Sequence, residues 1–361
     1  MRVGLFASAL MLLSVSLMTP PAQAQDWIYP IRSGDTLWSL CLEYTNKPGC
    51  WQELGKHNGI TADTRIPVNA EIRIPVAWLT NVPQVGEVIA LAGEVFYDAR
   101  SDGTVKAVQR GQSLALGSTI SVSTGSATIR LMHEGEIILR AGSRLMLESM
   151  STRREVKGVT ELKLEAGEAE IDVAPDSNSR FEVQTPSAIA AVRGTQYRLV
   201  AQEGTRGEVI EGAVAVEAAS TIVVDQGFGV LAREGEPVGE PRKLLAAPAF
   251  AESGAVASVP YTVRWSPQPG AVAWRLDVYA DAQSGALIAT HNTAAPEHLL
   301  DELPLGCYRL ALRAIDKEGF NGMPADTTLC IEPAPPPPVE ETPNYWKAFV
   351  SILGFMLIVV L

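Results

Sequence analysis

Few residues of this chain could carry covalent chemistry. The chain has four cysteines and four histidines. An even number of cysteines in an exported protein indicates disulfides, and we expect the bridges Cys41–Cys50 and Cys307–Cys330. The first bridge would close a short loop and contribute on the order of 2 to 3 kcal/mol. Free buried thiols are the alternative for the first pair, and independent small core residues for the second.

The second bridge follows from a predicted hairpin. The segments "CYRLALRAID" and "DTTLCIEP" flank the loop "KEGFNG", and the midpoint between Cys307 and Cys330 falls inside that loop. The two cysteines should therefore face each other across an antiparallel ladder, with Cα atoms about 5.5 Å apart.

Two motifs suggest catalysis or cofactor binding but lack the necessary context. Gly227 to Ala232 has the pattern GxGxxA, but "REGEPVGEP" follows at once, so no helix can present its N-terminus to a pyrophosphate. His133 lies near Glu134 and Glu136, which a hairpin turn explains better than a metal site. No nucleophile, histidine and carboxylate form a recognisable set. We predict a protein that is not an enzyme and that uses no cofactor or metal.

Charge and the first residues indicate where the protein works. The formal net charge is −12, with 29 Lys+Arg against 41 Asp+Glu, so nucleic acid is not an expected partner. Residues 1–24 hold an apolar run from Val3 to Met18 and end in Ala22-Gln23-Ala24, which predicts a cleaved secretory signal. An uncleaved membrane helix is the alternative. We expect a periplasmic protein.

Residues 26–78 predict a small unit of strand, helix, helix and strand. The strand Tyr29 to Arg32 leads to Ser33-Gly34-Asp35-Thr36, where Asp35 or Thr36 can cap a helix. That helix has the apolar face Leu37, Leu40, Cys41 and Tyr44. A second helix begins near Trp51 and stops at Asn58-Gly59. The strand Glu71 to Pro75 should pair with the first.

The motifs of this segment resemble the lysin motif (LysM) family. "GDTLWSL", "WQELGKHNGI" and the closing "IRIP" stand at the family's spacing. The resemblance implies binding of N-acetylglucosamine-containing glycan, peptidoglycan or chitin, between two loops. On this sequence the first loop is Gly34, Asp35, Thr36 and Leu37, and the second is Asn58, Gly59 and Ile60. The structural alternative is that these residues only cap and turn. Val68-Asn69 replaces the family's common Pro-Gly.

Residues 86–238 predict an all-β domain. Glycines separate short alternating runs such as "STISVST", "ATIRLM", "EIILRAG" and "AVAVEA", and Asp102-Gly103 marks a hairpin. The pattern TPxxxxxVRGTxY at Thr185 to Tyr197 and EGxVxV at Glu211 to Val216 resemble the FecR domain. That resemblance implies an extracytoplasmic sensor that relays to a sigma factor. The relay needs a cytoplasmic segment and a membrane helix, whereas this chain begins with a predicted cleavable signal, so a domain that meets another protein, or a spacer, is expected.

Residues 260–332 follow a predicted linker at 239–259 and contain the segments "YTVRWSPQPGAVAWRLDVYAD" and "LPLGCYRLALRAIDKEGFNG". These segments resemble a fibronectin type III (immunoglobulin-like) β-sandwich. Trp265 and Trp274 should fill its core, and Tyr308 should make a tyrosine corner. His291 and His298 are expected in loops, exposed to solvent.

The last residues predict a spacer and an anchor. "PAPPPPVEETP", within residues 333–344, is a stiff proline-rich linker. Residues 345–361 are apolar apart from Lys347, and a helix of about 24 Å could hold the protein in the inner membrane. Packing onto the protein's own core is the alternative.

The sequence therefore predicts a multidomain envelope protein: a βααβ LysM module, an all-β FecR domain, a fibronectin-like sandwich and a C-terminal hydrophobic helix. The first hypothesis is a non-enzymatic protein that binds peptidoglycan and presents its β domain to an unidentified envelope protein. The second is a FecR-type signalling component that relays to a membrane partner. The third, a cell-wall hydrolase or its accessory, lacks assignable catalytic residues.

Overall fold

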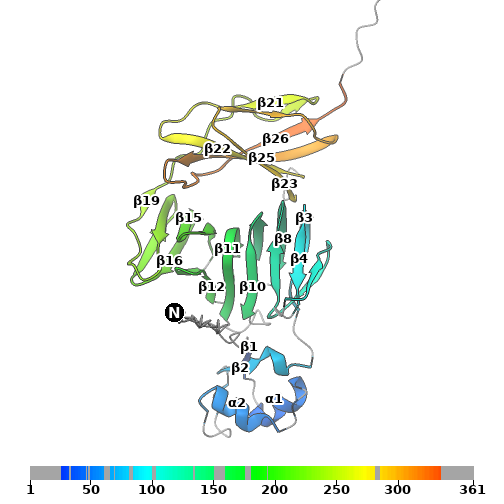
Figure 1. Ribbon diagram of the computed structural model, residues 1–361, viewed down its shortest axis with the longest axis vertical. Helices are drawn as coiled ribbons and strands as arrows, with labels where there is room; N and C mark the ends of the chain where they lie inside the picture. Colours follow the sequence, from blue (N-terminus) through cyan, green and yellow to red (C-terminus); the bar gives the residue numbers. More distant parts are fainter. Residues whose placement is uncertain are drawn as a thin grey trace, which may run out of the picture. The chain divides into compact units, whose positions relative to one another are not determined.

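The computed structural model describes residues 26–31, 34–45, 47, 49–60, 66–68, 70–80, 84–99, 103–132, 135–149, 159–174, 180–192, 194–280 and 285–334 (Figure 1). The chain divides into two compact units, the first ending at Leu244 and the second beginning at Leu245. The predicted signal (1–24) and anchor (345–361) lie outside the described residues. Within the described ranges, no helix is long and apolar enough to cross a membrane.

The first unit begins with the small βααβ module. Its elements are β1 (Asp26–Pro30), α1 (Leu37–Tyr44), α2 (Trp51–His57) and β2 (Glu71–Pro75). β1 and β2 pair antiparallel, as the sequence predicted, with Tyr29 opposite Ile72. A short 3-10 turn, η2 (Val76–Trp78), leads out of the module.

Aromatic rings and aliphatic side chains fill the core of this module. The rings of Trp27 and Tyr44 meet edge to face with centroids 5.0 Å apart, and Trp27 and Tyr29 meet at 5.3 Å. Leu40 and Leu54, from the two helices, are fully buried. Since so small a module has little apolar surface to bury, these contacts and the Cys41–Cys50 bridge described below hold it together.

A double-layered β domain follows, built from β3 to β19. One sheet has the strand order β6 (Ser113–Ala115), β3 (Gln84–Ala92), β8 (Ser126–Leu131), β9 (Gly135–Arg140), β11 (Val159–Val173), β14 (Gln196–Ala201), β15 (Thr205–Glu211), β18 (Phe228–Ala232), β19 (Arg242–Lys243). The other has the order β5 (Val105–Ala107), β4 (Val95–Asp98), β7 (Thr119–Val122), β10 (Arg144–Ser149), β11, β12 (Arg180–Gln184), β13 (Ile189–Val192), β16 (Ala213–Glu217), β17 (Thr221–Asp225). Neighbouring strands run antiparallel except the parallel pair β11–β12. The alternating runs quoted above form β7, β8, β9 and β16, so these predictions are confirmed.

The strand β11 belongs to both sheets. Its first half pairs with β10 and β12, and its second half pairs with β9 and β14. The crossing lies at Gly167, whose φ is +86° and whose Cβ, if it had one, would lie 2.4 Å from Ser143 Cα. The Ser143 hydroxyl donates to the Glu168 carbonyl oxygen (2.8 Å) and accepts from the Glu168 N–H (2.9 Å). Only glycine allows this approach.

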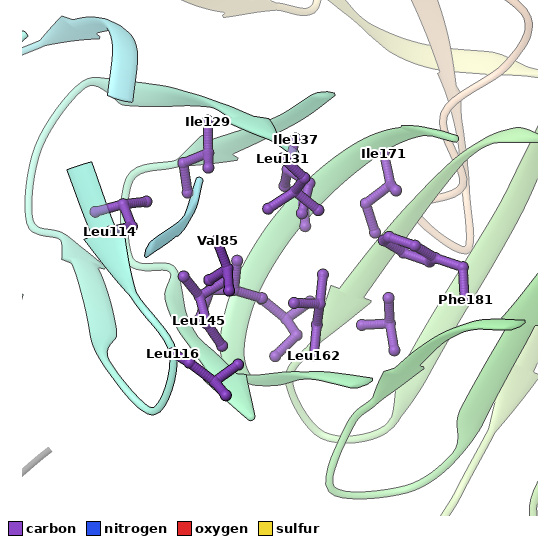
Figure 2. Packing of buried hydrophobic residues seen from close by; sticks show 14 of the residues in the cluster. Val85, Leu114, Leu116, Ile129, Leu131, Ile137, Leu145, Leu162, Ile171 and Phe181 are labelled. Atoms are coloured by element: carbon purple, nitrogen blue, oxygen red, sulfur yellow. The ribbon is translucent and has the colours of Figure 1, made fainter. Parts of the chain in front are cut away.

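Side chains from both sheets meet in one apolar layer. Figure 2 shows Leu145 and Leu162 of one sheet, and Ile137 of the other, in the same cluster, which also includes Phe181 of β12 and Ile171 of β11. All five side chains are at most 1 % exposed. The period-2 pattern of the sequence therefore gives each sheet one apolar face for this core.

The second unit is a β-sandwich of a large and a small sheet. The large sheet has the order β20 (Ala255–Ala257), β26 (Ala325–Ile331), β25 (Gly306–Asp316), β22 (Ala271–Tyr279), β23 (Leu287–Thr293), and the small one pairs β21 (Tyr261–Arg264) with β24 (Glu297–Leu300). Trp265 and Trp274 are buried with ring centroids 6.2 Å apart. The Tyr308 hydroxyl donates to the Pro304 carbonyl oxygen at 2.7 Å, the contact expected of a tyrosine corner.

Cys307 and Cys330 stand opposite each other on β25 and β26 and form a disulfide. The predicted register and bridge are confirmed, but the Cα atoms are 4.0 Å apart rather than about 5.5 Å. Opposed residues in an antiparallel ladder alternate between a wide and a narrow spacing, and this pair lies at the narrow end.

Residues 239–259, which the sequence predicts as a linker, make backbone hydrogen bonds within each unit. In the first unit, which ends at Leu244, the Gly239 N–H donates to the Leu231 carbonyl oxygen and the Leu244 N–H donates to the Gly227 carbonyl oxygen. In the second unit, the Ser266 N–H donates to the Ala249 carbonyl oxygen. The alanine- and proline-rich composition hides this pairing because no apolar alternation accompanies it.

The placement of His291 and His298 in solvated loops was wrong. His291 lies on β23 and His298 on β24, both are half-buried, and their rings stack with centroids 4.1 Å apart. The run "LIATHNT" has a weak alternation, so the sequence did not mark the strand.

Candidate functional site

The two loops expected to bind a ligand meet in the βααβ module. The first loop enters α1, and the second follows α2. A Cβ at Gly55 of α2 would lie 3.1 Å from the Ile60 carbonyl oxygen and 3.4 Å from Leu37 Cδ1, and the Ile60 N–H donates to the Gly55 carbonyl oxygen at 2.7 Å. The absence of a side chain at Gly55 therefore lets both loops close onto α2.

The first loop is fixed by reciprocal hydrogen bonds. Thr36 is the N-cap of α1: its Oγ1 accepts from the Ser39 N–H, and its own N–H donates to Ser39 Oγ, both at 3.0 Å. Asp35 Oδ2 accepts from the Tyr29 hydroxyl at 2.9 Å. Burial, followed by the bond to Asp35, raises the pKa of Tyr29 above its ordinary value, so the phenol stays a donor.

The second loop depends on an asparagine side chain. Asn58 Nδ2 donates to the carbonyl oxygens of Leu54 (2.9 Å) and Arg73 (2.8 Å), and its Oδ1 accepts from the Arg73 N–H at 2.7 Å. Gly59 follows with φ +65°, where a side chain would be strained. Asn58 thus joins the end of α2 to β2.

The seven predicted ligand residues consequently divide by role. Gly34 and Gly59 are exposed, while Asp35, Thr36, Asn58 and Ile60 are partly buried. Leu37 is 1 % exposed and belongs to the core. The structural alternative of capping and turning therefore describes Thr36, Leu37 and Asn58, whose side chains serve the framework.

Three residues near these loops make contacts or are exposed in ways that the sequence did not indicate. Tyr29 holds Asp35, and the backbone of Arg73 receives Asn58. Trp38, the second residue of α1, is 55 % exposed. The pattern of apolar residues in β1 could have marked Tyr29 as buried, but only the fold shows that its hydroxyl contacts Asp35.

A disulfide joins the two helices of the module. Cys41 and Cys50 are bonded, with Cα atoms 5.8 Å apart, and both are 1 % exposed. The Thr45 hydroxyl donates to the Cys41 carbonyl oxygen at 2.7 Å. The bridge therefore fixes the end of α1 to the start of α2.

The motifs rejected in the sequence have structural roles. Gly227–Ala232 contains the strand β18 rather than a turn that opens a helix. Glu136 pairs with Arg130 at 3.1 Å, and His133 and Glu134 lie outside the described residues. In the parts of the chain that the structure describes, no group of three or more His, Cys, Asp or Glu side chains could hold a metal ion.

Two family models match the chain. The LysM domain model matches residues 29–75, and the FecR protein model matches residues 118–215. The first range contains both candidate loops. The second contains β7 to β15 and part of β16.

Solved structures with similar parts are distant. One, titled a "putative anti-sigma factor" from Parabacteroides distasonis, is 21 % identical with TM-score 0.31, and the match covers 35 % of this chain and 59 % of that one. Another, the extracellular domain of a "putative one component system" from B. thetaiotaomicron, is 7 % identical with TM-score 0.18, covering 68 % and 50 %. The two family models are more specific than these similarities: the chain carries a LysM domain followed by a FecR domain.

Proposed function

We propose that the LysM domain binds the N-acetylglucosamine-containing glycan of peptidoglycan at the surface formed by residues 34–36 and 58–60. The observation that carries this proposal is the closure of both loops onto Gly55 within a matched LysM domain. Gly34 and Gly59 are exposed there and, lacking side chains, present only neutral backbone groups to a ligand. Such neutral groups suit the hydroxyl and acetamido groups of the sugar.

In this proposal the protein is not an enzyme, and its other two domains serve in interactions or as spacers. The FecR domain would present its surface to a protein partner in the cell envelope, and the C-terminal unit would act as a fibronectin-like interaction or spacing module. The Tyr308–Pro304 hydrogen bond supports that resemblance. The match to the FecR model also favours a second candidate, a periplasmic signalling component that relays to a membrane partner.

The proposed location is the periplasm, with residues 345–361 as an anchor in the inner membrane. Removing Trp346 to Leu361 should release the protein from the membrane fraction. Unchanged membrane association would assign the anchoring to another segment or to a partner.

Cosedimentation with purified peptidoglycan sacculi tests glycan binding. The full chain should sediment with sacculi, and soluble N-acetylchitooligosaccharide should compete. Gly59→Val and Gly235→Val form a matched pair, because both glycines have positive φ (+65° and +73°) and no atom within 4 Å of a built Cβ. G59V should weaken binding and G235V should not. Wild-type protein left in the supernatant at low and moderate salt contradicts the proposal.

Crosslinking followed by purification separates the two candidates. Recovery of glycan alone supports wall binding as the main role. Recovery of a membrane signalling protein bound to the FecR domain supports the relay.

A further inference from the structure

Two histidines of the second unit meet between its two sheets. His291 belongs to β23, the edge strand of the large sheet, and His298 belongs to β24 of the small sheet. His291 stands opposite Leu276 of β22, and His298 stands opposite Val263 of β21. Directly opposed residues share one face of a sheet, and both apolar partners belong to the core of the sandwich. The two imidazoles therefore point inward from separate sheets and close its edge.

Neither imidazole is engaged by a hydrogen bond within the protein. The ring centroids are 4.1 Å apart with a tilt of 32°, and in the described part of the chain no protein group hydrogen-bonds to either ring. Both side chains are half-buried, and their ring nitrogens remain in reach of solvent. His291 and His298 thus place nitrogen lone pairs beside each other at a position open to a ligand from solution.

The spacing of the two rings suits a shared metal ion. Imidazole nitrogen is a preferred ligand of divalent late transition-metal ions such as Zn²⁺, Ni²⁺ and Cu²⁺. With metal–nitrogen bonds of about 2.0 to 2.1 Å, two imidazoles on one ion hold their ring centres roughly 4 to 5 Å apart. The observed 4.1 Å lies within this range. Ligation therefore requires rotation of the two side chains about their torsions but no change in the spacing of the strands.

The charges around the pair favour a cation over an anion. The carboxylates of Asp277 and Asp301 both act on His291. Asp277 is engaged by Arg313, whereas Asp301 follows β24 directly and is exposed. Burial, followed by the charge of His298, lowers the pKa of His291, so the pair resists double protonation. An anion would need protonated rings, whereas a metal ion binds the neutral form.

We propose that His291 and His298 together bind one divalent late transition-metal ion, with water completing its coordination, and that the ion clips the two sheets of the sandwich together. The pair is smaller than the groups of three or more ligands that were excluded above for the described residues. A structural zinc site has four protein ligands, so an ion on two should exchange readily with solution. The site does not depend on glycan binding, and it makes the stability of the second unit respond to metal concentration.

Isothermal titration of the metal-free full chain with Zn²⁺ at pH 7.5 tests this site. His291→Gln and His298→Gln should each lower the affinity by at least about tenfold, because losing a ligand costs no less than losing a group that orients one. His57→Gln, which removes a histidine of the LysM domain, should leave the affinity unchanged. Zn²⁺ should also slow hydrogen exchange in β23 and β24 of the wild type and of H57Q, but not of H291Q or H298Q. Mg²⁺, which prefers oxygen ligands, should not slow it.

Spectroscopy of the wild type tests the site without any substitution. Zn²⁺ should shift the ring nitrogen resonances of His291 and His298, and bound Cu²⁺ should show coupling to two imidazole nitrogens in electron paramagnetic resonance. Unshifted ring resonances would overturn the proposal and assign the pair to packing alone. Unchanged Zn²⁺ affinity in H291Q and H298Q would overturn it as well, and a loss in only one of the two variants would contradict a shared ion.

Discussion

Two hydrogen bonds join the side-chain amide of Asn58 to the backbone of Arg73. Asn58 Oδ1 accepts from the Arg73 N–H at 2.7 Å, and Asn58 Nδ2 donates to the Arg73 carbonyl oxygen at 2.8 Å. This amide extends the ladder of β2 by imitating a neighbouring strand. An asparagine that family resemblance assigns to ligand binding is thus needed to place the loop that follows it.

Asn58→Ala should therefore act on stability before it acts on binding. The change leaves backbone groups of Arg73 without their partner, and the expected loss is about 1 to 3 kcal/mol in the LysM domain. Hydrogen exchange should become faster in α2 and β2. Asn292→Ala, on the exposed side of β23, is the control. Unchanged protection of α2 and β2 would contradict the role given to Asn58.

Replacing both Cys41 and Cys50 by serine should loosen the same module. The chain-entropy model gives a loss of about 2 to 3 kcal/mol for so short a loop. Amides of α1 should exchange faster, while those of β22 and β25 in the second unit keep their protection. Because the second bridge lies in the other unit, the pair Cys307→Ser and Cys330→Ser should give the reverse pattern.

Lowering the pH should reduce the stability of the β-sandwich, because His291 becomes protonated. Burial, followed by the charge of His298, lowers the pKa of His291, and the charges of Asp277 and Asp301 oppose this only in part. The folded state therefore binds fewer protons than the unfolded state near and below pH 6.5. The contribution of neutral His291 is complete above that pH and is lost on acidification.

Thermal unfolding of the second unit between pH 7.5 and 5 measures this effect. His291→Gln should flatten the dependence, and His298→Gln should reduce it in part because it removes only the second cause. His57→Gln, in the LysM domain, is the control. A wild-type profile as flat as that of H291Q would contradict the prediction.

Glu208→Ala should strongly destabilise the FecR domain. Arg198 Nε lies 2.9 Å from Glu208 Oε2, and both side chains are fully buried. Removing Glu208 takes away the carboxylate beside the buried Arg198 guanidinium, at a cost of about 3 to 5 kcal/mol. The exposed pair Arg233–Glu236 is the matched control, and Glu236→Ala should change stability by less than about 1 kcal/mol. Chemical denaturation compares the two variants.

Local patterns predicted most of the architecture. The cap at Thr36, the stop at Asn58-Gly59 and the short alternating strands depend on residues close in sequence, and these are the interactions that residue types report. The facing pair Cys307 and Cys330 was predictable for a related reason, because hairpin symmetry fixes which residues stand opposite.

Other features depend on contacts between distant residues. The bond from Tyr29 to Asp35, the stacking of His291 on His298 and the burial of Arg198 beside Glu208 all need the folded sheet. The sequence showed charged and aromatic residues at these positions but not their partners. The predicted signal, spacer, anchor and domain boundaries stay predictions.

The shared strand β11 has a consequence for cooperativity. It is the middle strand of both sheets, so melting either sheet removes the centre of the other. The FecR domain should therefore have no stable half: a fragment ending at Gly167 would leave β9 without its neighbour in one sheet and β11 without β12 in the other. A load applied to one sheet should also strain the other, because β11 runs through both.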